Sequence, residues 1–154
     1  MIDEILDEWH FVRSETLELF HALNDQQLQF TPPGDKWQPL FYQFACIGRT
    51  QVVYTKALQT GVMDIAYFSD EQLPNKHEHN TQAKLQKLLA EADEAFGAAA
   101  KVVSHVAWPD RELSTVRHIA KLISHERLHH GQLISYFTLA GIDLPYDFKQ
   151  NWAL

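Results

Sequence analysis

The segment His125–Leu133, HERLHHGQL, is the part of the chain where residue types and spacing point most directly to chemistry. His125 and His129 are four residues apart, so on a helix their side chains lie one turn apart, about 40° apart around the axis. Two imidazoles placed in this way can reach one metal ion. His118 falls on nearly the same stripe, but it lies about 10 Å of helix rise from His125, too far to share that ion easily. We therefore predict a two-histidine metal platform, the alternative being two histidines that pack or bond to water.

The same residues spell H-E-x-x-H, the zinc-protease motif, in which Glu126 would be the general base. Such a zinc site needs a third protein ligand. No glutamate follows Glu126, and the extended motif would need glycine and histidine where the chain has Gln132 and Ser135. No strand is expected that could align a peptide. The sequence therefore disfavours a protease.

A di-iron carboxylate site is the second metal hypothesis for a helical protein. It requires two Glu-x-x-His motifs and a glutamate from each of two further helices. Glu126 to His129 and Glu18 to His21 both match the motif. The expected helix over residues 39–61 contains no carboxylate, so the di-iron hypothesis is also disfavoured.

Four segments with helical periodicity would have to position these residues. We expect helices over about residues 2–23, 39–61, 81–106 and 115–140. Asn24-Asp25 closes the first helix, and proline, glycine or a capping hydroxyl bounds the other three. No stretch alternates with period two, so no strand is expected. The pattern predicts an all-α four-helix bundle, formed as one domain over residues 1–154.

The connections after the first and second helices are long. They allow crossovers that a plain up-down-up-down bundle would not need. Residues 63–68 are expected to add a short turn to the second connection. The aromatic tail after Gly141 is expected to pack back on the bundle.

Several other residues are candidates for a site. Cys46 is expected to be a buried structural thiol, since no lysine or histidine flanks it in sequence. Arg49 could pair with a carboxylate or bind an anionic substrate group. The run from His77 to His79 is expected to be solvated loop. Aromatic residues near the start of the second helix either rim a pocket or pack in the core; these are Trp37, Phe41 and Tyr42.

Composition excludes some partners and favours one compartment. The 154 residues carry a formal net charge of −7, which argues against nucleic-acid binding through phosphate contacts. No apolar run is long enough to cross a bilayer, and the acidic start does not resemble a signal peptide. The single cysteine excludes an internal disulfide. We expect a cytoplasmic protein without membrane or nucleic-acid partners.

The run from His125 through His129, Gly131, Gln132 and Leu133, followed by Gly141-Ile142-x2-Pro145, resembles the DinB/YfiT-like superfamily of four-helix-bundle metalloenzymes. Trp37-Gln38-Pro39 is similar to the family's entry to its second helix, and the resemblance spans the whole chain. It implies that His125 and His129 are metal ligands. It also implies a third ligand, normally a histidine of the second helix. No histidine lies between His21 and His77, so Gln43 and His21 are the candidates for that position.

The resemblance further implies a function. Family members include metal-dependent transferases that use low-molecular-weight thiols. We therefore expect an enzyme that holds Zn, Ni or Fe between the second and fourth helices, acts on a small molecule as an S-transferase, and forms a homodimer. The alternative is a non-catalytic bundle with a degenerate metal site that acts as a binding or interaction protein.

Overall fold

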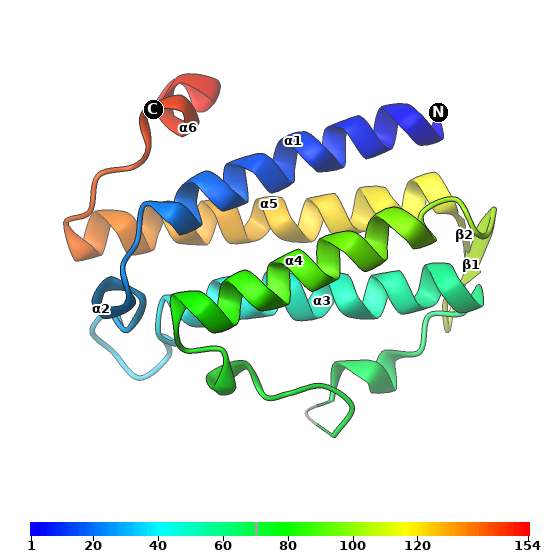
Figure 1. The fold of residues 1–154 in the computed structure, drawn as a ribbon, viewed down its shortest axis with the longest axis horizontal. Coiled ribbons are helices and arrows are strands. Elements are labelled where there is room, and N and C mark those ends of the chain that lie inside the picture. Colours follow the sequence, from blue (N-terminus) through cyan, green and yellow to red (C-terminus); the bar gives the residue numbers. More distant parts are fainter. Residues whose placement is uncertain (70) are drawn as a thin grey trace.

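Four long helices lie side by side in the computed structural model, which describes residues 1–69 and 71–154 (Figure 1). They are α1 (Ile2–His21), α3 (Phe41–Thr60), α4 (Gln82–Ala99) and α5 (Thr115–Ala140). Helix α3 packs against both α4 and α5, and α1 packs against α5. The predicted all-α bundle is confirmed, and the fourth helix has the predicted bounds. No helix among the described residues combines the length and apolar character needed to span a membrane.

The two long connections differ in what they do. The first contains the short helix α2 (Asp25–Leu28) and leaves α1 and α3 antiparallel (Figure 1). The second contains two 3-10 turns, η1 (Ile65–Phe68) and η2 (Lys76–Glu78). It carries the chain back along the bundle, so that α3 and α4 run in the same direction (Figure 1). The second connection is therefore a crossover, and η1 confirms the expected short turn.

A small β-hairpin joins α4 to α5, where the sequence led us to expect helix as far as residue 106 and no strand. Helix α4 ends at Ala99, and β1 (His105–Ala107) pairs antiparallel with β2 (Glu112–Ser114). Each strand has only three residues, and one of them is buried. An alternation this short cannot be distinguished from helical spacing, which explains the error.

Helix α5 is held at both ends by local interactions. The side chain of Ser114 accepts a hydrogen bond from the backbone N–H of Arg117 at 3.3 Å, as an N-cap does. Gly141 follows the last turn with a φ of 67°, a left-handed conformation that glycine adopts without strain. The tail then forms α6 (Tyr146–Trp152), whose Phe148 is buried. The expectation that the tail packs back on the bundle is confirmed.

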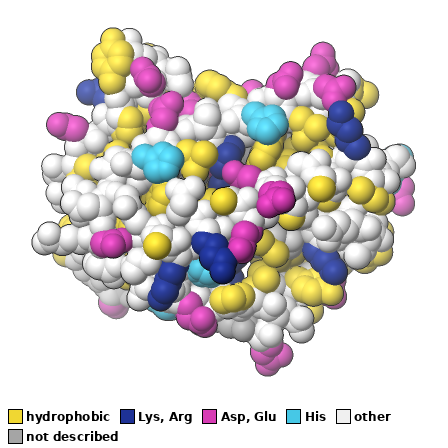
Figure 2. Space-filling model, in the orientation of Figure 1, with side chains coloured by type: hydrophobic (Ala, Val, Ile, Leu, Met, Phe, Trp, Pro, Cys, Tyr) yellow, Lys and Arg dark blue, Asp and Glu magenta, His cyan; other side chains and the backbone are white. Residues whose placement is uncertain are grey.

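The core consists of two apolar clusters with a polar layer between them. One cluster lies around Phe20, Phe44 and Phe137, and the other around Trp9 and Phe96. The polar layer between the clusters is buried and draws on three helices; its residues include Arg13, Thr16, Gln51, Glu126 and His130. At the surface, acidic and basic side chains are interspersed on the face shown in Figure 2 rather than gathered into one stripe. The middle of the bundle is thus where charged side chains are buried.

Candidate metal centre

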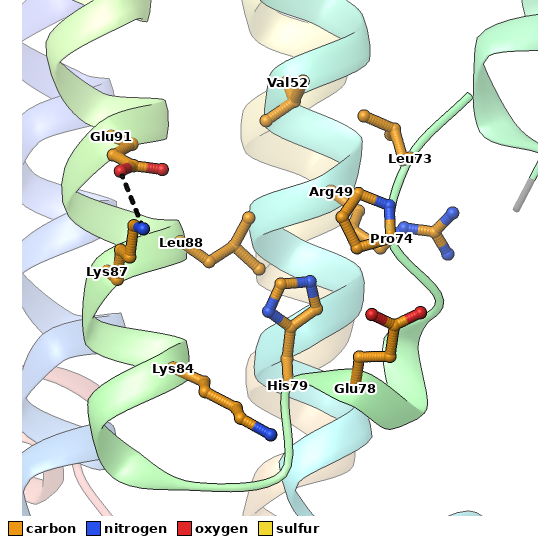
Figure 3. Close-up of a pocket in the computed structure, with 10 residues that line it drawn as sticks. All are labelled: Arg49, Val52, Leu73, Pro74, Glu78, His79, Lys84, Lys87, Leu88 and Glu91. Carbon is orange, nitrogen blue, oxygen red and sulfur yellow. Dashed lines mark ion pairs between the residues drawn. The ribbon is translucent and has the colours of Figure 1, made fainter. Parts of the chain in front are cut away.

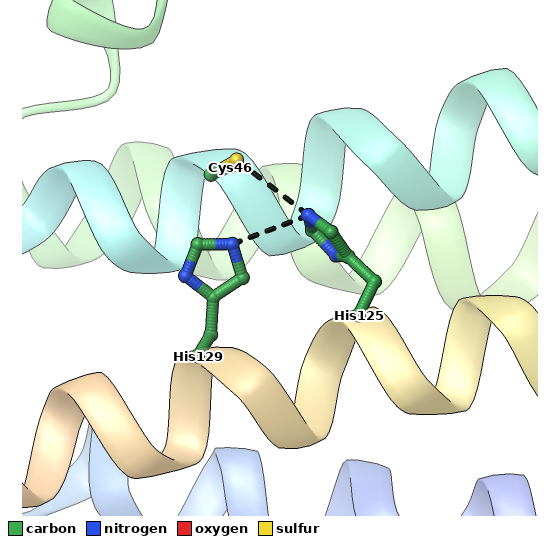
Figure 4. Close-up of side chains that lie close together, drawn as sticks. All are labelled: Cys46, His125 and His129. Atoms are coloured by element: carbon green, nitrogen blue, oxygen red, sulfur yellow. Dashed lines mark hydrogen bonds between the residues drawn. The ribbon is translucent and has the colours of Figure 1, made fainter.

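His125 and His129 lie next to each other on the side of α5 that faces α3 (Figure 4). Their Nε2 atoms are 3.2 Å apart, and their rings meet edge to face with centroids 4.6 Å apart. His129 is 7% exposed, and His125 is half-buried. The two imidazoles therefore present one ring nitrogen each to a common point, as the i, i+4 spacing predicted.

Cys46, on α3, is the third residue at this point (Figure 4). Its Sγ atom is 3.9 Å from Nε2 of His125, and one potential ligand atom from each of Cys46, His125 and His129 lies within 4.8 Å of the others. The expectation that Cys46 is buried was wrong, because it is half-buried, and a histidine approaches it from another helix. The signal that could have revealed it is that Cys46 is the one soft ligand in this helix.

Gln43 lies on the far side of His129 from the shared point. Its Oε1 atom accepts a hydrogen bond from Nδ1–H of His129 at 2.7 Å. Its Nε2 atom donates to the hydroxyl of Tyr136 at 3.4 Å, and that hydroxyl donates to the carbonyl of Gln38 at 2.7 Å. Because an amide oxygen only accepts, Nδ1 of His129 carries the proton and Nε2 keeps its lone pair. Gln43 thus orients a ligand, which is how residues behind metal-binding histidines act.

His21, the other sequence candidate for a third ligand, lies elsewhere. Its side chain is exposed, and its Nε2 atom is 3.3 Å from Oε1 of Gln86 on α4. The structure places it outside the group of ligand atoms formed by Cys46, His125 and His129.

Burial favours the uncharged form of both histidine rings. It lowers the pKa of His129 to about 4, and the neighbouring His125 lowers it further. Burial, followed by the positive charge of Lys76, also lowers the pKa of His125. Neutral imidazole is the form that binds a metal ion. Two neutral nitrogens with one thiol make a donor set that suits Zn²⁺ and not the hard ions Mg²⁺ or Ca²⁺, so the residues present fit a metal of the zinc type.

Glu126 lies away from the histidine pair, in the polar layer. It is 1% exposed, accepts a hydrogen bond from the hydroxyl of Thr16, and lies 3.4 Å from Nη2 of Arg13. Burial raises its pKa, although Arg13 opposes that effect. A carboxylate held in this way cannot act as the base of an H-E-x-x-H site. The burial of Glu126 and its contacts with Arg13 and Thr16 were not predicted, because the sequence motifs indicated this residue only as a catalytic base or an iron ligand.

A cavity of about 270 Å³ opens beside the cluster. The cavity is bounded by α3, by α5 and by the second connection. Its lining residues are Cys46, Arg49, Thr50, Tyr54, Phe68, Leu73, Lys76 and His125. The hydroxyl of Thr50 is 3.5 Å from Nε2 of His125, and burial raises the pKa of Tyr54 to about 12, so both hydroxyls keep their protons at neutral pH. A small molecule in this cavity would contact two of the three potential ligands.

A larger hollow of about 530 Å³ lies next to the cavity (Figure 3). It shares Arg49 and Leu73 with the cavity and extends between α4 and the second connection, past Leu88 and His79. Neither Cys46 nor His125 lines it. The smaller cavity is therefore the one where chemistry at the cluster could take place.

Comparison with known proteins identifies the family of this chain. A search among curated proteins found no match. The family model of the DinB superfamily matches residues 8–133, a stretch that contains Cys46, His125 and His129. Because the match covers well over half of the chain, and the fold is a four-helix bundle, this chain belongs to the DinB superfamily.

Proposed function

We propose that this protein is a metal-dependent enzyme that binds Zn²⁺, or a related divalent ion, through His125, His129 and Cys46. The observation that carries the proposal is the convergence of these three side chains from two helices at the edge of a cavity. Three protein ligands leave a further position for a substrate, as catalytic zinc sites do. Membership of the DinB superfamily supports the proposal.

The reaction class that we propose is transfer of a small thiol to an electrophilic carbon. The thiol sulfur forms the new bond, the leaving group departs with the electron pair of the bond that breaks, and the thiol releases its proton. A divalent ion bound here would supply a lower thiol pKa and hold the sulfur in place. The residues of the chain bind and orient: Gln43 fixes the ring of His129, and the hydroxyls of Thr50 and Tyr54 line the cavity.

The rival hypothesis is a metal-free bundle that acts as an interaction protein. Metal analysis of protein purified without a histidine tag separates the two. The enzyme proposal predicts close to one equivalent of metal, lost in His129→Ala and Cys46→Ala and kept in the control His105→Ala, because His105 is exposed on the hairpin. It also predicts stabilisation of roughly 2.7 kcal/mol when free metal is 100 times its Kd. A chain that stays metal-free and melts at the same temperature with added metal would falsify the proposal.

A further inference from the structure

The small cavity has a cationic lining in the part of the chain that the structure describes. Among its described lining residues, Arg49 and Lys76 carry charge, and none is a carboxylate. This contrasts with the chain as a whole, whose formal net charge is −7. Two cations have therefore been brought together beside the cluster from different segments, Arg49 from α3 and Lys76 from η2.

Both cations are held in position by the fold. Arg49 is 4% exposed, and its Nη2 atom donates to the carbonyl of Ser69 at 3.5 Å. Figure 3 shows its side chain reaching from α3 toward the second connection. Lys76 is half-buried, and its Nζ atom donates to the hydroxyl of Tyr42 at 3.2 Å and lies 4.9 Å from the centroid of that ring. A cation fixed in this way loses less entropy when it binds an anion.

Lys76 lies in the same cavity as two of the three proposed metal ligands. Lys76, Cys46 and His125 all line that cavity. An anion bound beside Lys76 would therefore lie close to the histidine nitrogens, within the same cavity. The volume of about 270 Å³ limits the occupant to a small molecule.

We propose that Arg49 and Lys76 form an anion-binding subsite that holds a carboxylate or phosphate group of the small molecule on which the metal centre acts. This inference rests on the proposed function, whose substrate it narrows to a small anionic compound. Arg49 offers planar paired donors and Lys76 a compact charge, a combination suited to either oxyanion.

The test uses the full chain loaded with Co²⁺, whose visible absorption reports a new ligand. Two thiols of similar size are titrated: 3-mercaptopropionate, which is anionic, and 2-mercaptoethanol, which is neutral. We expect the anionic thiol to bind more tightly, and Lys76→Gln to reduce the ratio of the two affinities by about tenfold, as the loss of one charge-assisted hydrogen bond would. Because the ratio is compared between proteins, intrinsic differences in thiol acidity cancel.

Lys87→Gln is the matched control, since Lys87 lines the neighbouring hollow but not the small cavity. It should leave the ratio unchanged. Competition by inorganic phosphate, stronger than by propionate, would assign the subsite to phosphate; the reverse order would assign it to carboxylate. An unchanged ratio in Lys76→Gln, with Co²⁺ bound, overturns the subsite and leaves the metal centre intact.

Failure to bind Co²⁺ would instead overturn the proposed function. Calorimetric titration of the metal-free protein with propionate and phosphate then tests the subsite alone. Binding that weakens in Lys76→Gln and persists in Lys87→Gln supports it, and the absence of any binding contradicts it. Lys76 lies on a connection and not in a long helix, so its replacement leaves the bundle core untouched.

Discussion

Gln43 and His129 form a hydrogen bond of 2.7 Å between α3 and α5, from Nδ1–H of the ring to the amide oxygen. The bond sets which nitrogen of His129 faces His125 and Cys46. It also shows why Gln43, a sequence candidate for the third ligand, lies at the centre without pointing to the shared position.

Replacing Gln43 by leucine should weaken metal binding without removing a ligand. Loss of a partner behind a metal-binding histidine typically costs about tenfold to a hundredfold in affinity. Gln43→Glu keeps an acceptor at Nδ1 and should retain most of the affinity. Competition with a chromogenic chelator measures both. Equal affinity in Gln43→Leu and the unaltered protein would show that the bond does not support the ligand.

Substitution of Cys46 should distinguish a ligand from a bystander. Cys46→Ala is expected to cost more affinity for Zn²⁺ than Gln43→Leu does, because it removes one of three donors. Cys46→His should retain binding with a harder donor set and shift preference away from thiophilic ions. Metal content and selectivity against Co²⁺ and Ni²⁺ are the measurements. Full Zn²⁺ affinity in Cys46→Ala would exclude this residue from the centre.

The buried histidines predict how the stability of the metal-free protein depends on pH. Burial lowers the pKa of His129 to about 4 and that of His130 to about 3, from an ordinary value of 6.5. Below pH 6.5 the unfolded chain binds protons that the folded chain does not, so the free energy of unfolding falls as pH falls toward about 4. The loss should reach up to roughly 3 kcal/mol per buried histidine. Urea unfolding at pH 7.5 and pH 5 measures this loss of free energy of unfolding. In His129→Gln, the free energy of unfolding should depend less on pH.

The ion pair between Arg13 and Glu126 should be structural. Arg13→Met removes the cationic partner of both Glu126 and Asp93, whose carboxylates lie 3.4 and 3.2 Å from the guanidinium, and should destabilise the fold by about 3–5 kcal/mol. Glu126→Leu leaves Arg13 paired with Asp93 and should cost less. The double variant should lose less than the sum of the two, a coupling that urea unfolding of all four proteins can detect. The Glu126→Gln variant should bind metal as the unaltered protein does, because the side chain at position 126 faces Arg13 and Thr16 and not the histidine pair. A marked loss of metal in Glu126→Gln would contradict this assignment.

The sequence predicted the parts of the site that lie on one helix. His125 and His129 share α5, and their separation in space follows from helical geometry alone. Cys46 could not be found in the same way, because its approach to His125 depends on the register of α3 against α5. Core packing fixes that register, and it produces no regular spacing of residues in the sequence from which the contact could be predicted.

In the fold, too, features that depend on local sequence were predicted and features that depend on contacts between segments were not. The long helices have strong periodicity, and three of them have boundaries within two residues of those expected. The hairpin at residues 105–114 was missed because its strands are too short to show a pattern. The ion pair between Glu126 and Arg13 was missed because it joins two helices that are distant in sequence. Lys76 entered no prediction, because a lysine in a polar connection is normally solvated.

The second connection has a consequence for how this protein could diversify. The three proposed metal ligands all belong to α3 and α5, whereas Phe68, Leu73 and Lys76 reach the cavity from a segment outside the helical core. Changes of sequence in residues 62–80 can therefore alter the shape and charge of the cavity while the cluster stays intact. Under the proposed function, exchange of this one segment would change which small molecule binds and would leave the metal ligands in place.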